Sequence, residues 1–355
     1  MKKLLAAILA VSIVFGAGTI VPDSADHKSM QACASSEYTE GTYEFLKYKN
    51  YGDYIEISYC SILAEEVVIP SELDGVPVTV IGDSSFWNCK SLTSVTIPDS
   101  IERIDKYAFY NCIELTSVHI PDGVVSIGNG AFLGCTSLTS VNIPDSVVSI
   151  GNNAFCRCLS LKSVNIPKSI TSIDRFTFSE CSSLTSINIP ESITSLGEGA
   201  FFKCLGLTSV IIPDSVVSID NGVFWGCENM AYVIVPESVA NIGNSAFEAF
   251  KGTIYGFAGS TAQEFAEKKG YKFSILTLGD VDGDGAINSS DASLVLREYA
   301  LIATGEAPTF SESQKISADV NFDGAVDSSD ASVILAYYAY TSTGGTENIN
   351  NFMKK

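Results

Sequence analysis

Two acidic stretches near the C-terminus carry oxygen side chains at a spacing that suits a calcium ion. In each stretch, acidic or amide residues occupy positions 1, 3, 5, 9 and 12 of a loop, and glycine occupies position 6. A hard cation needs roughly six to eight oxygens, and glycine makes the sharp turn between the early and late ligands, while position 7 adds a backbone carbonyl. Two calcium ions are therefore expected, with these ligands: Asp280, Asp282, Asp284, Ala286, Asn288 and Asp291 in the first loop, and Asp319, Asn321, Asp323, Ala325, Asp327 and Asp330 in the second.

An apolar helical run follows each loop, whereas no amphipathic helix precedes either one. The two loop–helix units lie 39 residues apart and share the tail Ser-Ser-Asp-Ala-Ser. This duplicated unit, residues 278–342, resembles the type I dockerin, a small all-α calcium-binding domain that docks cellulosomal proteins onto the cohesin modules of a scaffoldin. The resemblance implies cohesin contacts from Ser289, Ser290, Leu296, Arg297, Ser328, Ser329, Leu335 and Ala336.

The identical serine pairs imply that either half of this domain could face the cohesin. Two differences between the halves break the symmetry: Arg297 corresponds to Ala336, and Glu298 corresponds to Tyr337. The sequence leaves open whether these differences select one orientation.

The middle of the chain repeats every 23 residues. Phenylalanines keep this step from Phe86 to Phe247, and prolines keep it from Pro98 to Pro236. A period of this length predicts a solenoid, because no single unit can bury its own apolar residues and stacked units bury a continuous core. The pattern resembles the BspA-like leucine-rich repeat. The expected fold class is an α/β-type leucine-rich-repeat solenoid with a parallel strand ladder, followed by the dockerin.

The start of the chain has the pattern of a secretory leader. Lys2 and Lys3 precede an apolar run and then small residues, which is typical of a signal peptide. Cleavage after Ala25 and cleavage after Ala34 both remain open, and a retained membrane anchor is the alternative. No other segment is long and apolar enough to span a bilayer. We therefore expect a secreted, extracellular, cellulosome-attached protein.

The expected division of the chain follows from these patterns. It comprises a signal peptide (1–34), an N-terminal cap with the first strand (35–77), the leucine-rich repeats (78–250), a C-terminal cap (251–276), the type I dockerin (278–342) and a flexible tail (343–355). The formal net charge of -20 argues against nucleic acid or an anionic membrane surface as a partner.

Ten cysteines in an exported protein raise the question of disulfides. Seven of them fall three residues after a repeat phenylalanine, as Cys89 follows Phe86. This position predicts a buried ladder of free thiols, since cysteine packs as a small hydrophobe. Cys33, Cys60 and Cys156 lie outside the ladder, and the sequence does not say whether any cysteines pair.

The residues between the core positions of the strands form the candidate ligand face of the repeats. This face carries no carboxylate, whereas a glycosidase needs two carboxyl groups about 5 to 9 Å apart. We therefore expect a binding module, not an enzyme, with an unknown protein or glycan as its ligand. The candidate face consists of His119, Asn142, Asn165, Asn188, Ile211, Tyr232 and Ile234.

Three alternatives to a protein-binding face stay open. The first is a strand face that is exposed to solvent and binds nothing, since short polar residues also suit such a face. A carbohydrate-binding module is a second possibility, because Trp87, Tyr110, Phe202 and Trp225 each follow a repeat phenylalanine, although semi-buried packing is the commoner explanation of such rings. The third is a polysaccharide-degrading enzyme of the O-glycosyl hydrolase class, suggested only by the proteins that usually carry dockerins.

Overall fold

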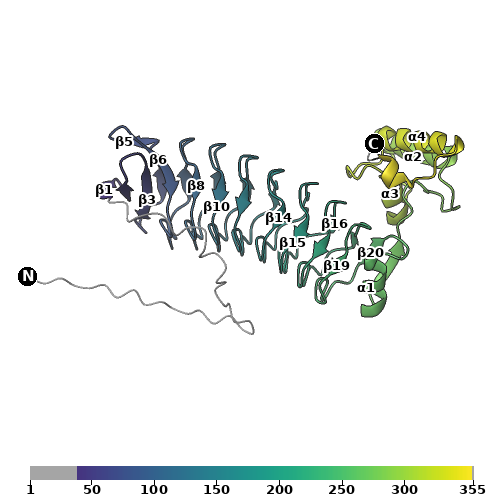
Figure 1. Ribbon diagram of the computed structural model, residues 1–355, viewed down its shortest axis with the longest axis horizontal. Helices are drawn as coiled ribbons and strands as arrows, with labels where there is room; N and C mark the ends of the chain where they lie inside the picture. The colour runs from purple at the N-terminus through teal and green to yellow at the C-terminus, as the bar shows by residue number, and fades with distance from the viewer. Residues whose placement is uncertain (1–37, 354–355) are drawn as a thin grey trace, which may run out of the picture. The chain divides into compact units, whose positions relative to one another are not determined.

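The computed structural model describes residues 38–353, so the expected signal peptide lies outside the described residues. Short strands stack one repeat above the next in the order of the sequence (Figure 1). Each repeat contributes up to two strands, which pair in parallel with the strands 23 residues away. From Thr39 to Gly256 the elements are strands joined by turns. The solenoid is confirmed, but tight turns replace the helix that an α/β-type repeat would carry.

One strand ladder follows the repeat leucines. Its strands are β4 (Glu66–Val68), β7 (Ser94–Thr96), β9 (Ser117–His119), β11 (Ser140–Asn142), β13 (Ser163–Val164), β16 (Ser209–Ile211) and β18 (Tyr232–Ile234). The second ladder follows the prolines. Its strands are β6 (Val76–Ile81), β8 (Arg103–Ile104), β10 (Ser126–Ile127), β12 (Ser149–Ile150), β14 (Ser172–Ile173), β15 (Ser195–Leu196), β17 (Ser218–Ile219) and β19 (Asn241–Ile242).

The repeat phenylalanines form one continuous stack inside the solenoid. Neighbouring rings from Phe86 to Phe247 lie 4.7 to 5.7 Å apart and nearly parallel. All eight rings are fully buried. Because every ring contacts the ring of the next repeat, burial of one depends on its neighbours, which is why a solenoid core is collective.

The cysteine ladder is buried beside this stack. The thiol of Cys112 donates to the carbonyl of Phe86 at 3.1 Å, and the thiol of Cys135 donates to that of Phe109 at 3.1 Å. The nine cysteines of the described chain are free and buried. Burial raises the pKa of the Cys135 thiol to about 12. Such thiols stay protonated and are chemically inert.

Further strands and one helix lie at the two ends of the array. At the first end there is an antiparallel sheet of β1 (Thr39–Tyr43), β2 (Leu46–Asn50) and β3 (Ile55–Cys60). Strand β3 then pairs in parallel with β6, and the short strand β5 (Glu72–Leu73) pairs antiparallel with β6. At the other end, β20 (Thr253–Gly256), α1 (Thr261–Lys269) and β21 (Lys272–Ile275) close the stack. Ser260 caps α1 by accepting from the backbone of Gln263, and Gly270 ends it at φ 75.

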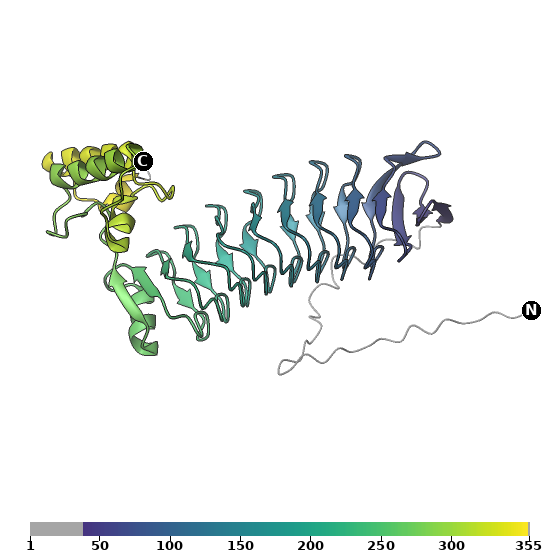
Figure 2. The ribbon, with the colours of Figure 1, turned by 180° about the vertical axis from the view of Figure 1, so that it is seen from behind.

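The C-terminal region is helical. Its helices are α2 (Ser289–Ala303), α3 (Glu312–Ala318), α4 (Ser328–Ser342) and α5 (Ile349–Met353). Helices α2 and α4 pack side by side (Figure 2). Among residues 38–353, no helix combines the length and apolar character that a membrane span requires.

Candidate functional site

The first acidic loop is already closed by hydrogen bonds to its own backbone. Asp280 accepts from the amides of Gly283 at 2.9 Å and Gly285 at 3.1 Å. Asp282 accepts from the amide of Asp284 at 3.1 Å. Oxygen atoms of these three carboxylates lie within 4.8 Å of one another. Three carboxylates converging on one point supply the hard oxygen donors that calcium prefers.

The aspartate at position 12 ties the start of each loop to the helix behind it. Asp291 is fully buried, and its oxygens accept from the amides of Val281 at 2.8 Å and Asn288 at 2.9 Å. Asp330 repeats this in the second loop with Val320 at 3.0 Å and Asp327 at 3.0 Å. Each aspartate is also the third helical residue and completes a capping box. The loop and the helix therefore form one unit.

The second loop repeats the geometry of the first and carries the same number of carboxylates, with one amide at position 3 instead of position 9. Asp319 accepts from the amides of Asp323 at 3.1 Å and Gly324 at 3.0 Å. Asn321 stands where the first loop has Asp282, and its amide nitrogen donates to Ser329 Oγ at 2.9 Å. A carboxylate cannot donate in this way. The two halves therefore differ next to one serine pair.

The carboxylates of the second loop are perturbed by burial and by one another. Burial, followed by the charge of Asp330, raises the pKa of Asp319 to about 6. Burial also raises the pKa of Asp330, against the backbone amides that lower it. Because the pKa of Asp319 is raised on folding, its ionisation opposes folding increasingly as the pH rises from about 4 to about 6 when no cation is present, and the full cost remains above that range. A bound divalent cation would offset this cost.

The strand face predicted to bind a ligand is exposed in only part of its length. His119, Asn142, Asn165 and Asn188 are exposed, as expected. The side-chain amide of Asn165 is nevertheless bonded to the backbone of Ile143, accepting from its nitrogen at 2.8 Å and donating to its oxygen. Asn165 thus extends the strand pairing at the end of the sheet formed by β9, β11 and β13.

The apolar end of that face is not free, and this part of the prediction is wrong. Ile234 is only 3 % exposed, in an apolar cluster that includes Leu276, Leu278 and Phe310. Tyr232 and Ile211 are half-buried against the same cluster. The strand alternation placed these side chains on the correct side of the strands. That side of the strands packs against other apolar residues and is not exposed to solvent.

Comparison with protein families identifies both parts of the chain. The model for the BspA type leucine rich repeat region, which describes six copies, matches residues 58–174 and again residues 148–261. The chain belongs to the BspA-type leucine-rich-repeat family. The model for the dockerin type I domain matches residues 278–337. The chain therefore carries a type I dockerin behind its repeats.

Solved structures with similar repeats come from several bacteria. A leucine-rich-repeat protein of T. pallidum is 28% identical, with a TM-score of 0.46 over 66% of this chain and 98% of that one. A leucine-rich-repeat protein of Bacteroides ovatus is 23% identical, with a TM-score of 0.40 over 69% and 77%. No curated protein matches the chain.

The dockerin exposes every residue that the resemblance assigned to cohesin contact. The two serine pairs are exposed at the starts of α2 and α4, and the helix positions lie about two turns further along. Sequence comparison of the two halves missed a second row of exposed apolar side chains, which consists of Tyr299, Ile302 and Tyr338. Tyr299 and Tyr338 lie three residues after Leu296 and Leu335 and are therefore their neighbours on the helix surface, and Ile302 lies three residues after Tyr299. This spacing could have revealed them.

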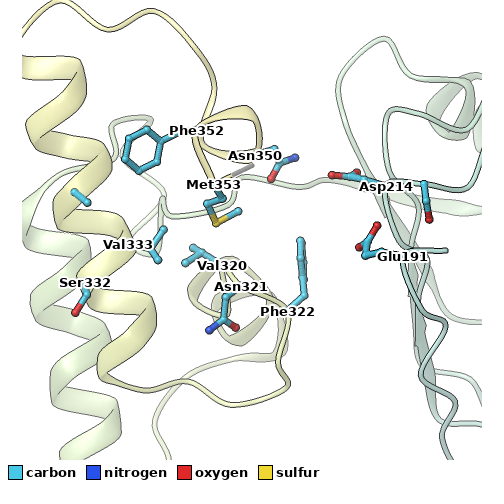
Figure 3. A pocket seen from close by; sticks show the side chains of 12 residues that line it. Glu191, Asp214, Val320, Asn321, Phe322, Ser332, Val333, Asn350, Phe352 and Met353 are labelled. Carbon is cyan, nitrogen blue, oxygen red and sulfur yellow. The ribbon is translucent and has the colours of Figure 1, made fainter. Parts of the chain in front are cut away.

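The C-terminal segment is not the flexible tail that was expected. Ile349 of α5 is buried, and the Tyr337 hydroxyl donates to the carbonyl of Glu347 at 2.9 Å. The ring of Phe352 lies 5.5 Å from that of Tyr337 and 5.2 Å from that of Tyr340. Phe352 and Met353 line one pocket with Val320 and Val333 (Figure 3). Helix α5 is therefore part of the dockerin core.

Proposed function

We propose that this protein is a secreted, non-catalytic component of a cellulosome. Its dockerin binds a scaffoldin cohesin when both loops hold calcium, and its repeats recognise a further protein during polysaccharide degradation. The proposal of cohesin binding rests on the near-identity of the two halves of the dockerin. Each pairs a closed acidic loop with an exposed serine pair, and exposed leucines, Leu296 and Leu335, lie at the same distance behind.

Two calcium ions follow from the matched loops. In each, the residue at position 1 accepts two backbone amides and the buried aspartate at position 12 fixes the loop to its helix. The ligands would be the side chains and carbonyls at positions 1, 3, 5, 7, 9 and 12. Bound calcium would supply positive charge that holds these carboxylates together.

A recognition role for the repeats rests on their exposed polar strand face. After Asn165 and the covered residues Ile211, Tyr232 and Ile234 are set aside, His119, Asn142 and Asn188 keep exposed side chains, and those of His119 and Asn142 lie on the adjoining strands β9 and β11. Short polar groups on a rigid ladder lose little conformational entropy on binding. This arrangement suits an extended, hydrogen-bonding partner surface.

The first prediction concerns catalysis. The full-length protein should release no reducing sugar from cellulose, xylan, mannan or pectin, because its strand face lacks the facing carboxylates that glycoside hydrolysis requires. The measurement is a reducing-end assay with calcium present, and a known xylanase in the same buffer serves as the positive control. Hydrolysis of any of these glycans by the purified chain would overturn the non-catalytic proposal.

The second prediction concerns the two halves of the dockerin. Changing Ser289 and Ser290 to glutamate should weaken cohesin binding only about twofold, because one of two equivalent orientations remains. Changing Ser328 and Ser329 in the same way should have the same effect. Changing all four serines should reduce affinity more than a hundredfold. The measurement is calorimetric titration of the full chain with cohesin.

The matched control for added charge is Ala307→Glu with Ser313→Glu, since both residues are exposed and lie outside the serine faces. Its affinity should equal that of the unmodified chain. Complete loss of binding from one pair alone would show that a single orientation is used. In that case the differences at Arg297 and Asn321 have already selected it.

A further inference from the structure

Three aromatic side chains gather on the turns of the first two repeats. The rings of Trp87 and Tyr110 stack 4.0 Å apart at an angle of 20°. The ring of Tyr107 meets both edge-on, at 5.7 Å and 5.9 Å. Trp87 nevertheless remains 41% exposed and Tyr107 39% exposed. The cluster is therefore ordered by its own contacts while much of its surface meets water.

The repeat backbone holds these rings in place. Trp87 and Tyr110 each follow a buried phenylalanine of the central stack. Tyr107 has a φ of 54, and its ring lies over Gly130, where an added Cβ would come 2.5 Å from its Cε1 atom. The third repeat thus makes room for the ring by having no side chain at this position. A site that is rigid before binding loses less entropy when a ligand arrives.

An asparagine comes next in the chain after two of these rings. Asn88 and Asn111 follow Trp87 and Tyr110, and Asn111 Nδ2 donates to Asn88 Oδ1 at 2.6 Å. This bond leaves hydrogen-bonding capacity on Asn88 Nδ2, a donor, and on Asn111 Oδ1, an acceptor. The next repeat has Gly134 beside this acceptor, where a Cβ would lie 3.4 Å from it. A donor and an acceptor side by side match two neighbouring hydroxyl groups.

From this arrangement we infer that Trp87, Tyr107 and Tyr110, with the amides of Asn88 and Asn111, form a binding site for a polysaccharide chain. The flat C–H face of a pyranose ring packs on the exposed aromatic surface, and its hydroxyl groups bond to the amide pair. A β-1,4-linked chain fits best, because its pyranose rings present flat faces. This site is independent of the proposed cohesin contact.

The size of the cluster favours a sugar over a protein. A buried aromatic side chain covers 150–250 Å², so three rings that are less than half exposed offer roughly 200–250 Å². A standard protein interface needs about 800 Å² from each partner. The cluster therefore suits one or two sugar rings.

A second tryptophan provides an internal comparison. Trp225 is 42% exposed, almost the same as Trp87, and its ring meets Phe202 edge-on at 5.7 Å. Lysine and glycine follow these two rings in place of the asparagines, and Lys203 Nζ lies over the Phe202 ring at 5.1 Å. This second cluster has comparable aromatic exposure but no amide pair, so it should not bind the saccharide.

The experiment uses the two tryptophans of the chain as separate reporters. In the full-length variant Trp225→Phe all tryptophan emission comes from Trp87, and in Trp87→Phe it all comes from Trp225. Each is titrated with cellohexaose, xylohexaose and mannohexaose in a chelator, so that the result does not depend on cohesin or calcium. We expect a saturable change in Trp87 emission with at least one of these sugars and none in Trp225 emission.

Calorimetry with the same oligosaccharide tests the amides. Asn111→Ala, which leaves the three rings in place, should weaken binding about tenfold or more, as should Trp87→Ala, whereas Trp225→Ala should bind like the unmodified chain. Equal melting temperatures would show that the variants are folded. No saturable signal from Trp87 with any of the three sugars, an equal response from Trp225, or capture of a protein through Trp87 without a sugar response would overturn the assignment.

Discussion

Replacing Asp280 and Asp319 together with alanine is expected to abolish cohesin binding while the repeats stay folded, because the core of the repeats contains no residue of either loop. Each residue is the first ligand of its loop and accepts two backbone amides. Its loss removes a ligand and also the bonds that close the loop. A ligand present at about 100 times its dissociation constant stabilises a domain by about 2.7 kcal/mol, and the double variant should lose this calcium-dependent gain.

The measurement is cohesin titration with calcium and with a chelator, together with a thermal melt under both conditions. Glu306→Ala is the matched control, because Glu306 is an exposed acidic residue of the same domain outside both loops. It should bind cohesin normally. Cohesin binding that survives in the chelator would contradict the calcium-dependent docking proposal.

Replacing Ile234 with serine is expected to destabilise the protein strongly, although the sequence places this residue on a ligand face. Ile234 is buried among Leu276, Leu278 and Phe310. Removing a buried isoleucine and leaving a hydroxyl there costs about 2–5 kcal/mol. For a region of this size each kcal/mol lowers the melting temperature by roughly 2–4 °C, so a fall of about 5–15 °C should appear in a thermal melt.

Ile211 provides the matched control for this substitution. It pairs with Ile234 in register on the neighbouring strand but is only half-buried. Ile211→Ser should therefore lower the melting temperature by a clearly smaller amount. If Ile234→Ser melted like the unmodified chain, Ile234 would face solvent and could again be considered part of a ligand face.

The closed acidic loops and the period of the core could be predicted because their causes are local. The ligands of one loop lie within twelve residues, so their spacing alone specifies the turn. The phenylalanine and cysteine positions recur every 23 residues, and identical units can bury them only by stacking like on like. No knowledge of distant contacts is needed for either conclusion.

Exposure could not be predicted in the same way, because it depends on what packs on a face from elsewhere in the chain. Strand alternation puts Ile234 on the outer side of β18, but residues after β21 cover it. Helix α5 has too little length to be recognised as part of a core, and Ile349 is buried only through contacts with residues such as Gly279, far away in sequence.

The same distinction applies to the two proposed sites. The sequence by itself determined the acidic loops, the serine pairs and the repeat register, since each depends on spacing along the chain. Only the tertiary structure decided that Trp87 and Tyr110 stack while remaining exposed, and that Asn88 and Asn111 share a hydrogen bond. These contacts join different repeats, and their geometry depends on how closely one turn of the solenoid lies on the next.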